Sequence, residues 1–368
     1  MVRWCWLLTA LWLCACSIRE DVVARIVTRE PGPTRTPDAG PKYDASPEPE
    51  PDAGCPDADG CAEPPEPPPR CAPQGCTSLT TRTDFCAASQ PPVALLGDSC
   101  GDDGRLQFHF AVCSCSDLIT NSSFTVDALG ATGTPASIAI NDELRLGPDT
   151  SIAGAVYVTG RYGATAAPQV SDGVVQNAPA RCGCGADQLL NVLPLIAARA
   201  LDNDNAAAML DPSLLDGYDA PQTLSLDCGR YYFDEVNGGN QQLTIDARGR
   251  VGLFIAGDLS VNGGFKLNLA PGASAVIFVG GNVHVGGRLE LGSTGDANRV
   301  LLVVNGNGTV DLRDGLIQGT LYAPRAELVT RGPFELRGSL FVNRANFDDD
   351  ATIHFRPLTM SQSMCSGN

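Results

Sequence analysis

Between Val251 and Phe355 the chain repeats a pattern of short apolar runs and polar breaks. Stretches such as VGLFIAGDLSVNGG and AVIFVGGNVHVGG open with an apolar run, break at Gly or Asn, and then alternate apolar and polar residues. The repeats begin near Val251, Ala275, Val300, Gly319 and Gly338, 19 to 25 residues apart. Repeats of this length are typical of stacked arrays, in which one turn cannot bury its apolar face without the next.

The strands of these repeats are too short, and the gaps between them too tight, to hold crossover helices. We therefore predict a mainly β fold, a right-handed parallel β-helix or β-solenoid, over residues 226–365. Apolar runs broken by Gly and Asn-Asp also occur between Ser137 and Gly163. They predict a smaller set of solenoid layers within a Cys-containing, β-rich N-terminal subdomain, residues 77–185.

One segment between these parts has a helical pattern. In ADQLLNVLPLIAARALDNDNAAAML, Leu189, Leu190, Leu193 and Ile196 recur at helical spacing. Pro194 predicts a kink or a division of this helix. We interpret residues 186–225 as a helical connector, which covers the apolar end of the solenoid and protects its strand edges.

The first residues, MVRWCWLLTALWLCACS, are typical of a signal peptide. A positive residue precedes an apolar run that is too short to span a bilayer, and the run ends in Leu-Cys-Ala-Cys. This ending resembles a bacterial lipobox, which predicts a signal peptide over residues 1–16 and lipidation of Cys16, with Cys14 as second candidate. An ordinary secretory signal is the alternative. Ser17, by resemblance to envelope sorting signals, favours the outer membrane.

Residues 17–76 are predicted to be a disordered tether rich in Pro, Asp and Glu. From Pro31 to Pro73 the chain has almost no large apolar residues, so burial cannot offset the entropy of ordering this stretch. Such a chain is extended and semi-stiff, and would hold a folded body away from the membrane. The net charge of −17 and the pI near 4.5 exclude nucleic acid as the expected partner.

Cysteine usage favours disulfides. Of 15 cysteines, two leave with the signal peptide and Cys16 is lipidated, so 12 remain. An even number in an exported chain indicates disulfide bonds. We expect Cys228 to pair with Cys365, which would staple the ends of the solenoid segment. The Cys-x-Cys pairs at 113 and 182 leave a zinc site as an alternative, although that spacing fits zinc poorly. The candidates are Cys55, Cys61, Cys71, Cys76, Cys86, Cys100, Cys113, Cys115, Cys182, Cys184, Cys228 and Cys365.

The chain resembles an uncharacterised family of bacterial envelope lipoproteins of the myxobacterial type. The resemblance rests on LDCGRYYFDEV, LYAPRAEL and LRGSLFVN, and on the steps Gly257-Asp258-Leu259, Leu321-Tyr322-Ala323-Pro324 and Gly338-Ser339-Leu340. The DNDNAA stretch and the Cys-x-Cys pairs also match, so that residues 105–365 are covered. The resemblance implies a Gly-rich domain of short strands behind a Pro-rich tether, in the cell envelope. It implies no activity.

Catalytic chemistry on a β-helix would need carboxylates from adjacent layers in one groove. Asp258, Asn282 and Asn305 occupy corresponding places after three successive breaks, and one acid followed by two amides predicts a hydrogen-bonded ladder. The acids Asp348, Asp349 and Asp350 predict a solvated turn, with a catalytic or Ca²⁺ site as the alternative.

The remaining candidates are basic. Of the histidines His109, His284 and His354, His284 has apolar neighbours at alternate positions and is expected to face solvent or a groove. Arg325, Arg331, Arg337 and Arg344 predict either a solvated face that offsets the acids or a basic strip for an anionic glycan.

These patterns predict no catalytic residue, cofactor or metal. We expect a lipid-anchored outer-membrane protein with a structural, adhesive or polymer-binding body. Its partners would be the membrane and an envelope glycan or protein. A carbohydrate-active enzyme and a self-assembling module that stacks end to end are the alternatives.

Overall fold

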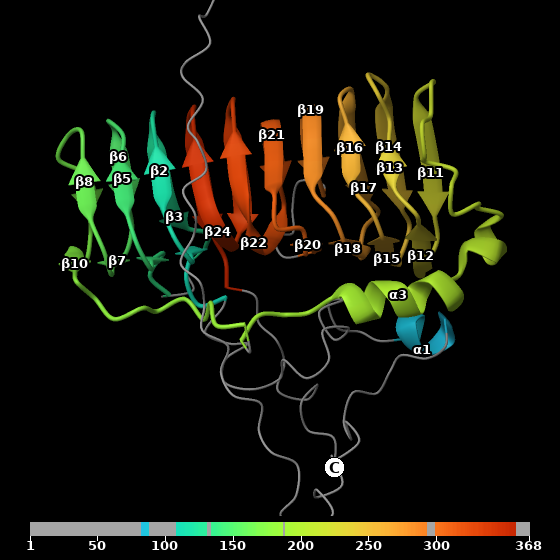
Figure 1. Cartoon of the computed structure of the whole chain (residues 1–368), viewed down its shortest axis with the longest axis horizontal. Helices are drawn as coiled ribbons and strands as arrows, with labels where there is room; N and C mark the ends of the chain where they lie inside the picture. Colours follow the sequence, from blue (N-terminus) through green and yellow to red (C-terminus); the bar gives the residue numbers. More distant parts are fainter. Residues whose placement is uncertain (1–81, 88–107, 131–133, 187, 293–298, 358–368) are drawn as a thin grey trace, which may run out of the picture. The chain divides into compact units, whose positions relative to one another are not determined.

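The computed structural model describes residues 82–87, 108–130, 134–186, 188–292 and 299–357 (Figure 1). This part of the chain forms a parallel β-solenoid of about ten turns, which confirms the predicted fold class, while its right-handed sense stays a prediction. The helices of this part are α1 (Arg82–Ala87), α3 (Leu193–Leu201) and the 3₁₀ helix η2 (Asn205–Ala208). The predicted signal peptide and tether lie outside the described residues.

Three parallel ladders, which we name faces A, B and C, make up each turn. In stacking order, face A consists of β12 (Gly229–Phe233), β15 (Arg250–Ile255), β18 (Ser274–Val279), β20 (Val300–Val304), the first parts of β22 (Gly319–Thr330) and β24 (Leu340–Phe347), β1 (Val112–Ser114), β4 (Ile138–Ile140), β7 (Val156–Val158) and β10 (Val174–Gln176).

Face B consists of β13 (Val236–Asn237), β16 (Leu259–Val261), the first parts of β19 (Val283–Leu291) and β21 (Thr309–Ile317), the second parts of β22 and β24, β2 (Leu118–Thr120), β5 (Leu144–Leu146) and β8 (Tyr162–Ala164). Face C consists of β11 (Gln222–Leu226), β14 (Gln242–Ala247), β17 (Gly264–Leu269), the second parts of β19 and β21, β23 (Phe334–Gly338), β25 (Ala351–Phe355), β3 (Phe124–Ala128), β6 (Thr150–Ile152) and β9 (Gln169–Val170).

The turns do not stack in the order of the chain. Strand β1 pairs with β24 on one side and with β4 on the other, so residues 112–176 continue the stack beyond the last C-terminal turn. Figure 1 shows β2 next to β24, while β10 and β11 lie at opposite ends of the row. Residues 177–221, here called the return segment, connect these two ends. The predicted ranges 77–185 and 226–365 therefore contribute to one continuous solenoid.

The predicted repeat starts are in register on face A. Val251 pairs with Ala275, Ala275 with Val300, and Val300 with Gly319. Inward side chains alternate with outward ones along most strands, as in β25, where every second residue is buried. The inward Leu, Ile, Val and Phe side chains form one continuous core, so burial of apolar surface between successive turns is the main stabilising term.

Face A is buried on its outer side as well. Strands β12, β15, β18 and β20 are almost entirely buried, because the return segment packs over them. A second apolar cluster joins outward aromatic rings of this face, such as Phe254, Phe278 and Tyr322, to Leu190 and Ile196 of the return segment. The Phe254 and Phe278 rings stack with their centroids 5.0 Å apart. Ring stacking adds to the free energy gained by burial.

The helix is shorter than predicted. It covers Leu193–Leu201, and Pro194 lies in its first turn, where the missing backbone N–H costs nothing. The prediction of a kink at Pro194 was therefore wrong, since the helix begins there. The helix α3 packs on β12 and β15, on the outer side of face A, and a different part of the return segment covers the end of the solenoid.

That end is capped by the DNDN stretch. The Asn205 side chain donates to the Tyr232 carbonyl at 2.7 Å and accepts from the Tyr232 N–H at 2.9 Å. The Asp204 N–H donates to the Arg230 carbonyl at 2.7 Å, and the Asp204 carboxylate accepts from the Arg230 N–H at 2.8 Å. Four backbone groups on the outer edge of β12 are thus satisfied without another strand, which removes that edge as a template for pairing.

Close stacking requires glycine at some corners. A Cβ atom added to Gly319 would lie 1.9 Å from the backbone oxygen of Val300 in the neighbouring turn. We expect Gly319→Ala to destabilise the protein by about 3 kcal/mol, because the backbone must move to admit the methyl group. Gly163→Ala is the matched control, since no atom lies within 4 Å of its added Cβ, and urea denaturation should show almost no change. If both substitutions lowered the free energy of unfolding by the same amount, the close contact between Gly319 and the neighbouring turn would be contradicted.

Candidate interaction surfaces

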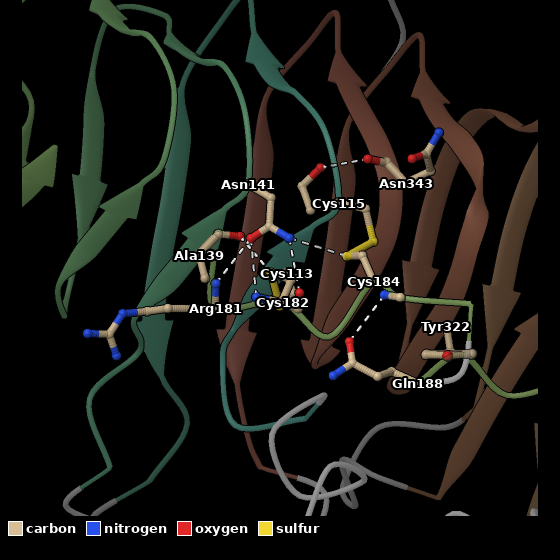
Figure 2. The surroundings of a disulfide bond; sticks show 12 residues. Cys113, Cys115, Ala139, Asn141, Arg181, Cys182, Cys184, Gln188, Tyr322 and Asn343 are labelled. Carbon is tan, nitrogen blue, oxygen red and sulfur yellow. Dashed lines mark hydrogen bonds between the residues drawn. A yellow bond between two sulfur atoms is a disulfide. The ribbon is translucent and has the colours of Figure 1, made fainter. Parts of the chain in front are cut away.

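Two neighbouring disulfides hold the return segment on the solenoid. Cys113 and Cys115, on either side of Ser114, pair with Cys182 and Cys184 of the return segment (Figure 2). These four cysteines are the ligands of the alternative zinc site, and in the structure they form two disulfide bonds instead. In the part of the chain that the structure describes, no group of three His, Cys, Asp or Glu is arranged to hold a metal ion.

The third disulfide joins Cys86 of α1 to Cys228. The predicted pairing of Cys228 with Cys365 was therefore wrong. The chain enters face A at Cys228, and α1 packs on β12 there, so the nearest partner comes from the N-terminal side. The candidates Cys55, Cys61, Cys71, Cys76, Cys100 and Cys365, and the lipidation candidate Cys16, lie outside the described residues.

Polar contacts reinforce the covalent attachment of the return segment. The Asn141 side chain, at the turn after β4, accepts from the backbone N–H groups of Arg181 and Cys182 and donates to the Cys182 carbonyl (Figure 2). The Tyr322 hydroxyl accepts from the Leu190 N–H at 3.1 Å, and burial raises the pKa of Tyr322 to about 12, so it stays neutral. Face A is therefore closed to partners along the described return segment, and faces B and C are the outer surfaces.

Face B carries a polar ladder in its middle turns. The outward residues Ser260, His284 and Asp311 are in register on three successive strands. The His284 Nδ1 lies 3.1 Å from Asp311 Oδ2, and its Nε2 lies 2.9 Å from Asn262 Oδ1. Arg331 adds a contact of 3.0 Å to the same Asp311 oxygen. The His284 side chain is 44 % exposed, which confirms that it faces solvent, and its ring nitrogens serve to connect neighbouring turns.

Face C carries a second polar cluster, where the two halves of the chain meet. The His354 Nδ1 lies 2.7 Å from Asp127 Oδ1, on the neighbouring strand β3, and its Nε2 lies 3.7 Å from Glu335. Arg337 bonds the same Glu335 oxygen at 2.6 Å. These four side chains form an open, mixed-charge surface. Because Asp127 and His354 are 227 residues apart in sequence, no local sequence pattern could have indicated the cluster.

The candidate acids serve as ties between turns. Asp258 Oδ1 accepts from the Asn282 N–H at 2.7 Å, and Asn282 Oδ1 accepts from the Gly308 N–H at 3.1 Å. Asp258 and Asn282 thus bond along the stack as predicted, but to backbone N–H groups of the next turn rather than to stacked side chains. The predicted ladder was wrong for Asn305, which follows Val304 directly, whereas Asp258 and Asn282 lie two residues further into their turns. The third turn is longer, and Asn305 accepts instead from Arg325 at 2.9 Å.

Asp348, Asp349 and Asp350 form the predicted turn, between faces B and C. Asp350 accepts from the Ser122 hydroxyl at 2.7 Å and Asp348 from the Asn121 amide at 3.0 Å, both in the next turn of the stack. Asp258 lies at a different corner, between faces A and B, and in a turn near the capped end. The two groups of candidate acids therefore do not converge on one groove.

Three of the four arginines are paired with acids, and Arg325 bonds to the neutral Asn305, so they do not form an unpaired basic strip. Arg331 contacts Asp311, Arg337 contacts Glu335, and Arg344 contacts Asp117 of the turn stacked on it. These contacts favour the solvated-face interpretation.

At the capped end two acids share a hydrogen bond, and this bond to Asp216, followed by the Asp216 charge, raises the pKa of Glu235. His109, the remaining histidine, is exposed and lies edge-on to Phe110.

Part of the chain matches a family model. Residues 192–360 match the family model described as "Domain of unknown function (DUF7305)". The match begins just before α3 and ends after β25, so it spans the capped end and every turn up to β25, and leaves out the turns of residues 112–176. No curated protein and no solved structure matches the chain.

Three disulfides indicate an oxidising, extracytoplasmic location. Within the described ranges, no helix is long and apolar enough to cross a membrane.

Proposed function

We propose that this protein is a lipid-anchored component of the cell envelope, whose β-solenoid body has a structural or adhesive role without catalysis. The observation that carries the proposal is the double disulfide attachment of the return segment over face A. It makes the body rigid in an oxidising compartment and leaves faces B and C as display surfaces. The candidate acids support the absence of catalysis, because they bond to neighbouring turns.

The anchor is tested by metabolic labelling with an alkyne fatty acid. The wild-type protein should carry the label, and Cys16→Ser should lose it completely, because the Cys16 thiol is the proposed site of lipid attachment. Cys14→Ser is the matched control and should keep the label. An unlabelled wild-type protein, or a label that survives Cys16→Ser, would overturn the anchor while leaving the solenoid unaffected.

The adhesive role is tested by co-sedimentation of the mature protein with isolated sacculi and with outer-membrane polysaccharide. We expect one of these polymers to retain the protein, and the double variant His284→Ala/Arg331→Ala to reduce retention about tenfold, because the exposed Arg331 guanidinium has further donors beyond its contact with Asp311 and His284 holds that carboxylate in place. Lys266→Ala on face C is the control. No retention by either polymer would contradict adhesion to a glycan, and release of new reducing ends would favour the carbohydrate-active enzyme instead.

A further inference from the structure

The two ends of the solenoid differ. At the β12 end, the DNDN stretch satisfies the outer edge with side-chain and backbone hydrogen bonds. At the other end, the outermost strands are β8, β9 and β10. Among the residues that the structure describes, each of these pairs with a strand on one side alone: β8 with β5, β9 with β6 and β10 with β7. The end formed by residues 161–177, here called the terminal turn, therefore presents free strand edges on all three faces.

The terminal turn also leaves the end of the core partly uncovered. Tyr162, Val170 and Val174 point into the solenoid but are each only partly buried. Their register partners one turn below, Leu144, Ile152 and Val156, are at most 1 % exposed. Covering this end would give the last turn the same burial as the turn below it.

The strands of this end carry no charges that would oppose pairing. Residues 161–177 include two charged residues, Arg161 and Asp172, and both lie at corners outside β8, β9 and β10. Exposed edges usually carry Lys or other charges, which make pairing with another chain unfavourable. The terminal turn lacks this protection, although the rest of the chain is rich in acids.

We propose that the terminal turn is the interface of a two-fold dimer, in which the open ends of two copies pair with each other. A two-fold axis through the middle of β10 makes β10 antiparallel to its counterpart in the second copy. The same axis places β8 of one copy opposite β9 of the other. The β10 edges then pair with each other, and the uncovered core residues of both copies face one another. Strands β8 and β9 come earlier on the rising turn, so their edges stay about one strand spacing further from the other copy. This inference goes beyond the proposed function and does not depend on the lipid anchor.

The charges of the terminal turn fit this arrangement. Arg161 lies at the corner between faces A and B, and Asp172 at the corner between faces C and A. The two-fold axis exchanges these corners, so Arg161 of each copy comes opposite Asp172 of the other. Both side chains are available: Arg161 is 82 % exposed and contacts Glu143, and Asp172 is exposed. The charges on the terminal turn of one copy are thus complementary to those on the terminal turn of the second copy.

The capped end makes the assembly closed. A head-to-tail filament would need the β12 edge of the next copy, which the DNDN stretch already occupies. A dimer through the terminal turn uses the same patch twice and leaves the two capped ends pointing outward, where the β12 edge is already occupied, so growth stops at two copies. The alternative of end-to-end self-assembly is thereby reduced to a dimer.

The experiment is sedimentation velocity of the mature chain, residues 17–368, exported so that its disulfides form. Over a hundredfold range of concentration we expect a monomer–dimer equilibrium and no larger species. Asp172→Arg should weaken the dimer about tenfold or more, because it makes two symmetric contacts repulsive, and Arg161→Asp should do the same. The double variant Arg161→Asp/Asp172→Arg should restore the affinity. Arg145→Asp is the control, since it lies one turn below and should leave the dimer intact.

Other results would overturn the proposal. A strictly monomeric wild type would assign the open end to a different partner or to none. A dimer that is insensitive to both charge reversals would contradict the two-fold arrangement, and growth into higher oligomers would contradict the closed end. Fatty-acid labelling of Cys16 is independent of all these outcomes, so failure of the dimer and failure of the anchor are distinguishable.

Discussion

Removing both disulfides that hold the return segment is expected to destabilise the protein by about 6 kcal/mol, whereas removing either one should cost about 2 kcal/mol. Each bridge closes a loop with a sequence separation of 69. Closing such a loop in the unfolded chain is worth about 4 kcal/mol in the chain-entropy model. Once one bridge is present, the second closes a small ring through Ser114 and Gly183, which is worth about 2 kcal/mol.

The measurement is a double-mutant cycle by urea denaturation. One variant replaces Cys113 and Cys182 by Ala, the second replaces Cys115 and Cys184, and the third replaces all four. The loss in the third should exceed the sum of the other two by about 2 kcal/mol, because only the third frees the long loop. Simple additivity would mean that the two bridges act on separate parts of the chain, and would contradict their common role.

Asn205→Ala is expected to cost about 3 kcal/mol, a large effect for one amide. The substitution leaves the buried N–H and C=O groups of Tyr232 without partners, and each unsatisfied buried group costs about 1 to 3 kcal/mol. Asn205 is itself 3 % exposed, so water cannot easily replace the lost bonds. Urea denaturation measures the loss, and the uncovered β12 edge should also increase aggregation.

Asn346→Ala is the matched control for this prediction. Its carbonyl accepts a long contact of 3.4 Å from Asn121 on the exposed side of face B. We expect a change within about 0.5 kcal/mol, as for most exposed positions. If both substitutions had this small effect, the DNDN stretch would not be the cap of the solenoid end.

The sequence predicted the repeats well and their spatial order not at all. The starts at Val251, Ala275, Val300 and Gly319 are in register because each inward side chain must stack on an equivalent one, and this constraint is visible as a period. The N-terminal layers were also visible, but the contact of β1 with β24 joins residues far apart in sequence. A repeat pattern predicts which residues face inward, and it carries no information on which turn follows which.

The same difference between local and long-range contacts applies to the candidate surfaces. Local contacts were predictable, such as the Asp258–Asn282 tie and the turn of Asp348, Asp349 and Asp350. Contacts across the junction of the two halves, such as His354 with Asp127, depend on the stacking order and were missed. The disulfide Cys86–Cys228 was missed because cysteine spacing does not determine connectivity. The DNDN stretch belongs to the family resemblance, which assigns it no role, and its role as a cap follows from its place at the outer edge of β12.

The central claim is that residues 112–176 stack on the last C-terminal turn, and a pair of introduced cysteines tests it most directly. Thr125 and Thr352 are register partners on face C. Neighbouring strands lie about 4.8 Å apart, within the range that a disulfide can join. We predict that Thr125→Cys/Thr352→Cys forms a crosslink that peptide mass mapping identifies.

The control pair is Thr125→Cys/Thr244→Cys. Thr244 belongs to the same outward row on face C, six strand pairings from Thr125, or about 29 Å. It should form no crosslink. If the turns stacked in chain order, Thr125 would lie many turns from Thr352, and the absence of the Thr125–Thr352 crosslink would contradict the structure described.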